Sequence, residues 1–231
     1  MKSFAAVLMA GGHSRRMGTS KALLDYHGMP LWHFQIQKLL RLGPRQLFLS
    51  VRKNVELAPG PWTFVHDRLP DAGPLAGLDA ALRHTCEDFL VVLAVDMPAM
   101  TSEFLSSLLR EAGPAGIVPR LAGLCHGTAA VYPVEILPLV ETILAGNDRS
   151  FQRLIRDALH CGLMRVRDIP PSSAGLFENW NSPEDSKLPT STRENEQSLA
   201  NGFDDQTVPS TTQPDGDSYV TLSSNSEPAE G

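Results

Sequence analysis

The sequence predicts an α/β fold in three layers, with a mostly parallel sheet covered by helices on both faces. Two observations support this prediction. Along residues 1–185, short β-rich runs alternate with amphipathic helix-like stretches, which is the order of βαβ units. Residues 89–95 (FLVVLAV) are apolar at every position, as expected of a central parallel strand that is buried on both faces.

The individual elements follow from local patterns. Strands are expected at residues 4–9, 46–51, 63–66, 89–95 and 116–118. Helices are expected from Pro30 to Gly43, over 77–84, and after Thr101, which is a suitable N-cap for a helix with Leu105, Leu108 and Leu109 facing inward. The remaining expectations are a strand at 124–132, helices at 136–145 and 151–160, and a last strand at 164–169.

The charge is distributed unevenly along the chain. Residues 186–231 contain two basic and eight acidic side chains and so account for the whole net charge of −6. Residues 1–185 are neutral, which gives no reason to expect a nucleic-acid or membrane partner. Residues 186–231 are also polar and rich in Ser, Thr, Asp and Pro, so we expect a disordered acidic tail after a folded domain at 1–185.

Several features favour a cytoplasmic location. No stretch approaches the roughly 20 apolar residues of a membrane helix, and the N-terminus has no export signal. The three cysteines are far apart and are expected to be buried free thiols.

The seven histidines lack the spacing of metal ligands. His126 is the best candidate among them for a ligand contact, although a structural role is the simpler interpretation.

The stretch AGGHSRRMGTSK, residues 10–21, follows the first expected strand. Gly11 and Gly12 allow the backbone to approach a ligand closely, and Arg15, Arg16 and Lys21 supply positive charge. The spacing is neither that of a dinucleotide-binding glycine motif nor that of a P-loop. By itself the stretch is compatible with a phosphate site or with a solvated basic loop.

Three more unusual stretches follow other expected strands, and ligands of parallel sheets bind beyond the carboxyl ends of the strands. Asp96 ends the apolar run and suits Mg²⁺, which takes one or two carboxylates together with phosphates and water, but it could also cap a turn. Asp67 precedes a glycine-rich helix start between Gly73 and Gly77. Near the end of the domain, ENWNSPED offers Asn179 and Asn181 for a polar ligand, or an ordinary helix start.

Together these stretches resemble the molybdenum cofactor guanylyltransferase family. The matching segments are LMAGGHSRRMGTSKALL, DRLPDAGPLAG, DMP and NWNSPED, and they occur in family order between about residues 4 and 185. The resemblance implies a Rossmann-like nucleotidyltransferase that transfers GMP from GTP to molybdopterin and releases pyrophosphate. It implies GTP and molybdopterin as substrates, Mg²⁺ as cofactor, and molybdoenzyme apoproteins or delivery chaperones as candidate partners.

The resemblance also implies roles for individual residues. It divides the domain into a nucleotide half, at about 1–115, and a pterin-facing half, at about 116–185. Arg16, Lys21 and Asp96 would be catalytic, with Asp96 as the metal ligand. The remaining implied contacts are to the nucleotide, from Met9, Ala10, Gly11, Gly12, Lys21, Asp67, Gly73 and Asp96, and to the pterin, from Asn179 and Asn181.

Two alternatives remain beside this interpretation. A cytidylyltransferase acting on the same pterin would usually carry Ala-Ala-Gly in place of Ala10-Gly11-Gly12 and would lack GPLAG, so the sequence favours guanine. A non-catalytic cofactor-binding or delivery protein need not keep both Lys21 and Asp96. The chain departs from the family pattern at Asp71, where a glycine is usual, and more mildly at Met9 and Ser182.

Overall fold

The structure is a computed structural model that describes residues 3–11, 21–52, 57–69 and 73–180. The predictions for Gly12, Arg15, Arg16, Asp71, Asn181, Ser182 and the tail at 186–231 lie outside these residues. Within the described ranges, no helix is long and apolar enough to cross a membrane.

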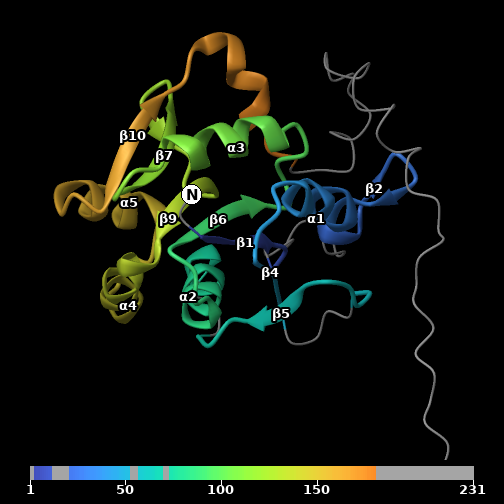
Figure 1. Cartoon of the computed structure of the whole chain (residues 1–231), viewed down its shortest axis with the longest axis horizontal. Coiled ribbons are helices and arrows are strands. Elements are labelled where there is room, and N and C mark those ends of the chain that lie inside the picture. Colours follow the sequence, from blue (N-terminus) through green and yellow to red (C-terminus); the bar gives the residue numbers. More distant parts are fainter. Residues whose placement is uncertain (1–2, 12–20, 53–56, 70–72, 181–231) are drawn as a thin grey trace, which may run out of the picture. The chain divides into compact units, whose positions relative to one another are not determined.

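An eight-stranded, mostly parallel sheet forms the middle layer, as predicted (Figure 1). β1 pairs in parallel with both β4 and β6, and β5 extends the parallel part beyond β4. β9 is antiparallel to β6 and β7, while β10 is parallel to β7. The order is β10 (Met164–Asp168), β7 (Gly116–Leu121), β9 (Ala129–Pro133), β6 (Phe89–Ala94), β1 (Phe4–Met9), β4 (Gln46–Val51), β5 (Thr63–His66), with β8 (Leu124–Cys125) beside β7.

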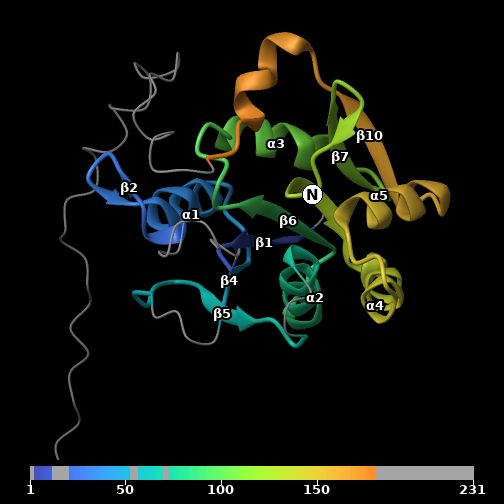
Figure 2. The same ribbon diagram turned by 180° about the vertical axis from the view of Figure 1, so that it is seen from behind.

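Helices cover both faces of this sheet, which completes the three layers. Figures 1 and 2 show α3 on the opposite side of β1 and β6 from α2. One face packs against α1 (Leu31–Arg41) and α3 (Ser102–Glu111), and the other against α2 (Pro74–His84), α4 (Leu137–Ala145) and α5 (Phe151–His160). The smaller elements are the 3-10 helices η1 (Lys21–Leu23), η2 (Val134–Ile136) and η3 (Pro171–Phe177), and a hairpin of β2 (Asp25–Tyr26) and β3 (Met29–Pro30).

The two layers of helices create two hydrophobic cores, one on each face of the sheet. Successive strand side chains point to opposite faces. In β1, Ala6 and Leu8 therefore join the core beneath α1 and α3, whereas Ala5 and Val7 join the core beneath α2, α4 and α5. This double burial explains why the runs that form β1 and β6 are apolar at every position.

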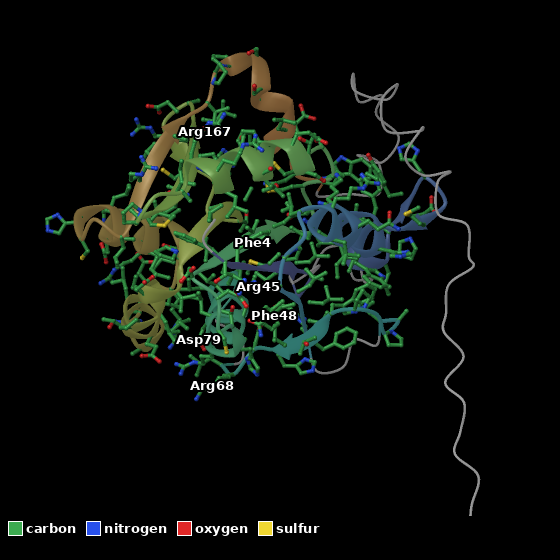
Figure 3. The ribbon with its side chains drawn as sticks, viewed as in Figure 1. Phe4, Arg45, Phe48, Arg68, Asp79 and Arg167 are labelled. Atoms are coloured by element: carbon green, nitrogen blue, oxygen red, sulfur yellow. The ribbon has the colours of Figure 1, made fainter. Side chains whose placement is uncertain are left out.

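The predicted start of α3 is confirmed. The Thr101 side chain accepts a hydrogen bond of 3.2 Å from the backbone N–H of Phe104, which satisfies one of the free amides of the first turn. Leu105 and Leu108 are buried as expected, but Leu109 is only partly buried. Arg167 of β10, which is labelled in Figure 3, donates through Nη1 to Ser107 Oγ at 2.6 Å and so ties α3 to this edge strand.

Several predicted boundaries are wrong. The helix expected over 77–84 begins three residues earlier, and the strand expected at 116–118 continues to Leu121. The strand expected at 124–132 is divided, because a turn in which Ala129 N–H bonds the His126 carbonyl separates β8 from β9. Pro30 belongs to β3 with extended torsions, so α1 begins one residue later. The helix expected at 136–145 starts as a 3-10 turn and becomes α-helical only at Leu137.

The expected burial of the cysteines is also wrong. All three thiols are free, but Cys86 and Cys161 are exposed and Cys125 is partly buried. Each lies at or just beyond the end of an element: Cys161 directly follows α5, Cys86 lies two residues beyond the end of α2, and Cys125 ends the short β8. An apolar thiol does not by itself determine burial when the local chain runs along the surface.

Gly77 provides a test of the packing between α2 and the sheet. A Cβ on Gly77 would lie 2.5 Å from Ser50 Oγ and 3.3 Å from Met9 Cε. We therefore expect Gly77→Ala to lower the free energy of unfolding by about 1–3 kcal/mol through overpacking. The measurement is urea denaturation of the purified variants.

Two further variants make this test specific. Ser50→Ala should relieve part of the loss when it is combined with Gly77→Ala, since it removes the nearest atom. Gly175→Ala is the matched control, because a Cβ there meets none of the described atoms within 4 Å. A stability of Gly77→Ala equal to that of Gly175→Ala would contradict the close packing.

Candidate active site

The carboxyl ends of four neighbouring parallel strands meet at one edge of the sheet. In the register of the sheet Met9 is paired with Ser50 and with Ala94, and Val51 is paired with His66. The residues that follow these positions come directly after the same edge: Ala10 and Gly11 after β1, Arg52 after β4, Asp67 after β5, and Val95 and Asp96 after β6. The structure thus brings together residues that lie up to 86 positions apart in the sequence.

The backbone after β1 is held by its neighbours on both sides. Ala10 N–H donates to the Ser50 carbonyl at 2.9 Å, and Met9 C=O accepts from Val95 N–H at 3.1 Å. Arg52 Nε donates to the Gly11 carbonyl at 3.0 Å. Among the described residues, a Cβ on Gly11 would meet nothing closer than 3.8 Å, so packing against them does not require glycine here. A glycine at such a position suits close approach of a ligand to the backbone.

Lys21 and Asp96 form an ion pair at this edge. Lys21 Nζ lies 3.2 Å from Asp96 Oδ2, and the two side chains are 19% and 27% exposed. The pair therefore remains accessible from solvent while it is partly shielded by the protein. An ammonium group, which is suited to phosphate, and a carboxylate, which is suited to a cation, lie side by side in this arrangement.

The segment that carries Asp96 also contacts the end of the folded domain. Trp180 N–H donates to the Asp96 carbonyl at 2.8 Å, and the Trp180 ring is buried, 5.0 Å from the ring of Tyr26. Asn179 precedes this anchor and is exposed. The structure therefore places one of the two expected pterin contacts next to the residue that bonds Asp96.

Asp67 lies half-buried after β5 in a positively charged setting. Burial raises the pKa of its carboxyl above the ordinary value, while the nearby charges of Arg52 and His66 act in the opposite direction. His66 is itself fixed, since its Nδ1 lies 3.0 Å from the Val51 carbonyl. Partial desolvation of an acid at a ligand-binding edge is a common property of functional carboxylates.

Gly73 positions the start of α2 near the same edge. Its φ of +70° lies in the left-handed region, which glycine adopts without a steric penalty. Because α2 follows β5 and packs against Met9 and Ser50, its first turn lies close to the ends of β1 and β4. The N–H groups of a first helical turn attract anions.

The structure therefore gathers most of the described residues that the sequence singled out, and it adds Arg52 to them. Arg52 directly follows an ordinary-looking strand, and no sequence pattern distinguishes it from a surface arginine. His126, by contrast, packs against the ring of Phe177 at 4.5 Å, and burial lowers the pKa of its imidazole. Among the described residues, no group of three or more His, Cys, Asp or Glu side chains could hold a metal ion.

The sequence matches a known domain family and proteins of known name. The model of the MobA-like NTP transferase domain matches residues 6–161. The molybdenum cofactor guanylyltransferase of Pseudomonas putida is 34% identical over 185 residues, which cover 77% of this chain and 93% of that protein.

Solved structures show the same fold at lower identity. Molybdopterin-guanine dinucleotide biosynthesis protein A from Archaeoglobus fulgidus has a TM-score of 0.60 and 22% identity, over 79% of this chain and 95% of that one. The 2-C-methyl-D-erythritol 4-phosphate cytidylyltransferase from Thermus thermophilus has a TM-score of 0.58 and 14% identity, over 81% and 96% of the two chains. The fold alone is thus compatible with more than one base and more than one acceptor.

The family model matches more than half of the chain, and the curated relative shares a third of its residues across almost its whole length. With Lys21 paired to Asp96 and with Asp67 after a strand that ends at the same carboxyl edge, this chain belongs to the family of MobA-like NTP transferases.

Proposed function

We propose that the protein is a molybdenum cofactor guanylyltransferase that transfers GMP from GTP to molybdopterin loaded with molybdenum. The observation that carries the proposal is the Lys21–Asp96 ion pair at the edge where β1, β4, β5 and β6 end. The name of the P. putida relative and the order of the sequence motifs support this choice of substrates. The reaction joins a phosphate oxygen of molybdopterin to the α-phosphorus of GTP, and the bond between the α-phosphorus and the bridging oxygen breaks as pyrophosphate leaves.

In this proposal the nucleotide lies along the carboxyl edge of the sheet. The backbone of Met9–Gly11 and the following Gly12 would hold it, Lys21 would bind its phosphates, and Asp67 and Gly73 would contact the nucleoside. Arg16 would lie near the transferring group, and Asn179 and Asn181 would face the pterin. Residues 1–115 would thus form the nucleotide half and residues 116–185 the pterin-facing half.

The reaction requires that the two substrates are positioned and that the negative charge of the phosphates is neutralised. The attacking group is a phosphate oxygen, so no protein nucleophile is needed. Lys21 would offset negative charge on the phosphates, and the fixed backbone after β1 would hold the α-phosphorus in line with the acceptor.

Asp96 fits a magnesium ion that is shared with the substrate. The described residues supply a single accessible carboxylate here rather than a cage of ligands, and Mg²⁺ typically binds one or two carboxylates together with phosphates and water. We propose that Asp96 holds Mg²⁺ in this way. When bound, the ion would polarise the phosphoryl oxygens and neutralise the charge that develops on pyrophosphate.

Two observations weigh against the alternatives. A delivery protein without catalysis would have no need of an ammonium 3.2 Å from an accessible carboxylate. A cytidylyltransferase is disfavoured by Gly12 and by the GPLAG segment, residues 73–77. Both alternatives predict different nucleotide dependence, so one assay separates all three.

That assay measures pyrophosphate release from GTP or CTP in the presence of molybdenum-loaded molybdopterin and Mg²⁺. We expect release with GTP and a kcat/KM for CTP that is at least about a hundredfold lower, since a site that hydrogen-bonds one base leaves polar groups unpaired with another. Release with CTP but not GTP would instead identify a cytidylyltransferase. Folded protein that releases none with either nucleotide would support the delivery function.

Replacement of Asp96 tests the proposed metal ligand. Asp96→Asn should lower Mg²⁺-dependent turnover by about a hundredfold or more, because the amide is a weak ligand for the cation, while circular dichroism remains unchanged. Asp157→Asn is the control, since Asp157 pairs with Arg153 and Arg156 on α5. Undiminished turnover in Asp96→Asn would remove this residue from the metal site.

Asp67 should reduce the stability of the fold at neutral pH. Because its pKa is raised in the folded state, folding favours the protonated acid, and the free energy of unfolding falls as the pH rises above the ordinary pKa of 3.8. We expect Asp67→Asn to be more stable than the parent protein at pH 7, with a difference that shrinks towards pH 4. Thermal unfolding as a function of pH measures this difference.

Asp168→Asn should behave in the opposite way. Hydrogen bonds from Arg120 lower the pKa of Asp168. Its ionised form therefore contributes stability at pH values above its ordinary pKa, and the variant loses this stability at neutral pH.

Destabilisation of Asp67→Asn at pH 7 would contradict the desolvation of the Asp67 carboxyl.

A further inference from the structure

Two polar side chains of α1 are buried beneath the segment that carries Asp96. Gln35 is 0% and Lys38 is 3% exposed. They are three residues apart and so lie on the same side of the helix, which faces residues 94–100. A helix that served only to cover the sheet would present apolar side chains at such positions.

Both side chains donate to backbone carbonyls of residues 94–100. Gln35 Nε2 lies 2.8 Å from the Met97 carbonyl and 3.2 and 3.3 Å from those of Ala94 and Val95. Lys38 Nζ donates to the Pro98 carbonyl and, at 2.8 Å, to the Met100 carbonyl. With the bond from Trp180 N–H to Asp96, each carbonyl from Ala94 to Pro98 accepts a hydrogen bond.

The second support, Trp180, is connected to the same helix. Lys38 Nζ lies 4.1 Å from the centre of the Phe34 ring. The Phe34 ring is 4.3 Å from that of Tyr26, which in turn is 5.0 Å from that of Trp180. One side of α1 therefore reaches the Asp96 segment directly through Gln35 and Lys38, and indirectly through this row of aromatic rings.

The free energy needed to bury these two polar side chains indicates that their hydrogen bonds serve a specific role. Burial of an ammonium group costs several kcal/mol unless hydrogen bonds compensate for the lost water. After β6 ends, its chain no longer pairs regularly with neighbouring strands, so its carbonyls need other donors. Gln35 and Lys38 supply those donors on both sides of Asp96, and they hold the backbone that sets the direction of its carboxylate.

We propose that Gln35 and Lys38 are positioning residues for guanylyl transfer, which act through the backbone of residues 94–100 to hold Asp96 where it binds the cation with the nucleotide. The inference rests on the proposed function, since it uses the role given there to Asp96. Outer partners of a metal ligand typically change metal affinity or activity by about 10–100-fold when they are replaced.

The test compares GTP binding with and without the cation. Lys38→Met and Gln35→Met keep the approximate length of each side chain but remove its donors. Calorimetric titration should give a Kd for GTP about tenfold weaker than that of the parent protein in Mg²⁺, and an unchanged Kd in EDTA, because Asp96 contributes through the cation. In turnover, the Mg²⁺ concentration for half-maximal rate should rise by a similar factor.

The matched control is Thr85→Val. Thr85 is also buried and its hydroxyl donates to Gln46 Oε1 at 3.0 Å, but it lies at the opposite edge of the sheet. This variant should lose stability without any change in the dependence on Mg²⁺. If Lys38→Met does not fold, Gln35→Met, which leaves the Lys38 bonds in place, supplies the test.

A folded variant with the Kd values of the parent protein in both Mg²⁺ and EDTA would overturn the proposal, and so would an equal weakening in both. Failure of the proposed function is a separate result. A parent protein that binds GTP with Mg²⁺ but transfers no GMP would contradict guanylyl transfer, while the calorimetric comparison of the variants would still decide whether Gln35 and Lys38 position Asp96.

Discussion

The parallel pairing of β1 with β4 on one side and β6 on the other determines where chemistry can occur in this protein. Parallel strands end at the same edge, so this pairing places Gly11, Arg52 and Asp96 together although they come from separate parts of the chain. The pairing in turn requires helices on both faces of the sheet, because β1 and β6 are apolar throughout. The position of the site thus follows from the same burial that stabilises the fold.

The charged groups at this edge interact with one another and are only partly shielded from solvent. Lys21 and Asp96 neutralise each other while remaining accessible, and Asp67 is half-buried beside Arg52 and His66. Such groups reduce stability or add little to it, and in the proposed function they would bind a ligand that brings phosphates and a cation. The buried side chains of Gln35 and Lys38 donate hydrogen bonds to the backbone that follows Asp96.

Much of this arrangement could be predicted from the sequence, and the exceptions have physical reasons. The strands at 4–9 and 46–51 and the Thr101 cap depend on short-range patterns, which the sequence displays directly. The break between β8 and β9 depends on a local turn that hydrophobic periodicity does not reveal. The burial of Lys38 could not be predicted, because its hydrogen-bond partners lie about 60 residues away in the sequence. A lysine on an amphipathic helix ordinarily indicates a solvated face.

In the proposed function the nucleotide lies at the carboxyl edge of the sheet and not at its amino edge, where Gly113, Glu135 and Arg165 line a cavity of about 470 Å³. Amide hydrogen exchange measured with and without GTP and Mg²⁺ distinguishes the two edges. We predict slower exchange on addition of GTP and Mg²⁺ at residues 9–11, 50–52, 66–67 and 95–97, and unchanged exchange at residues 113–116 and 162–165. Protection confined to the residues around the amino-edge cavity would contradict this account.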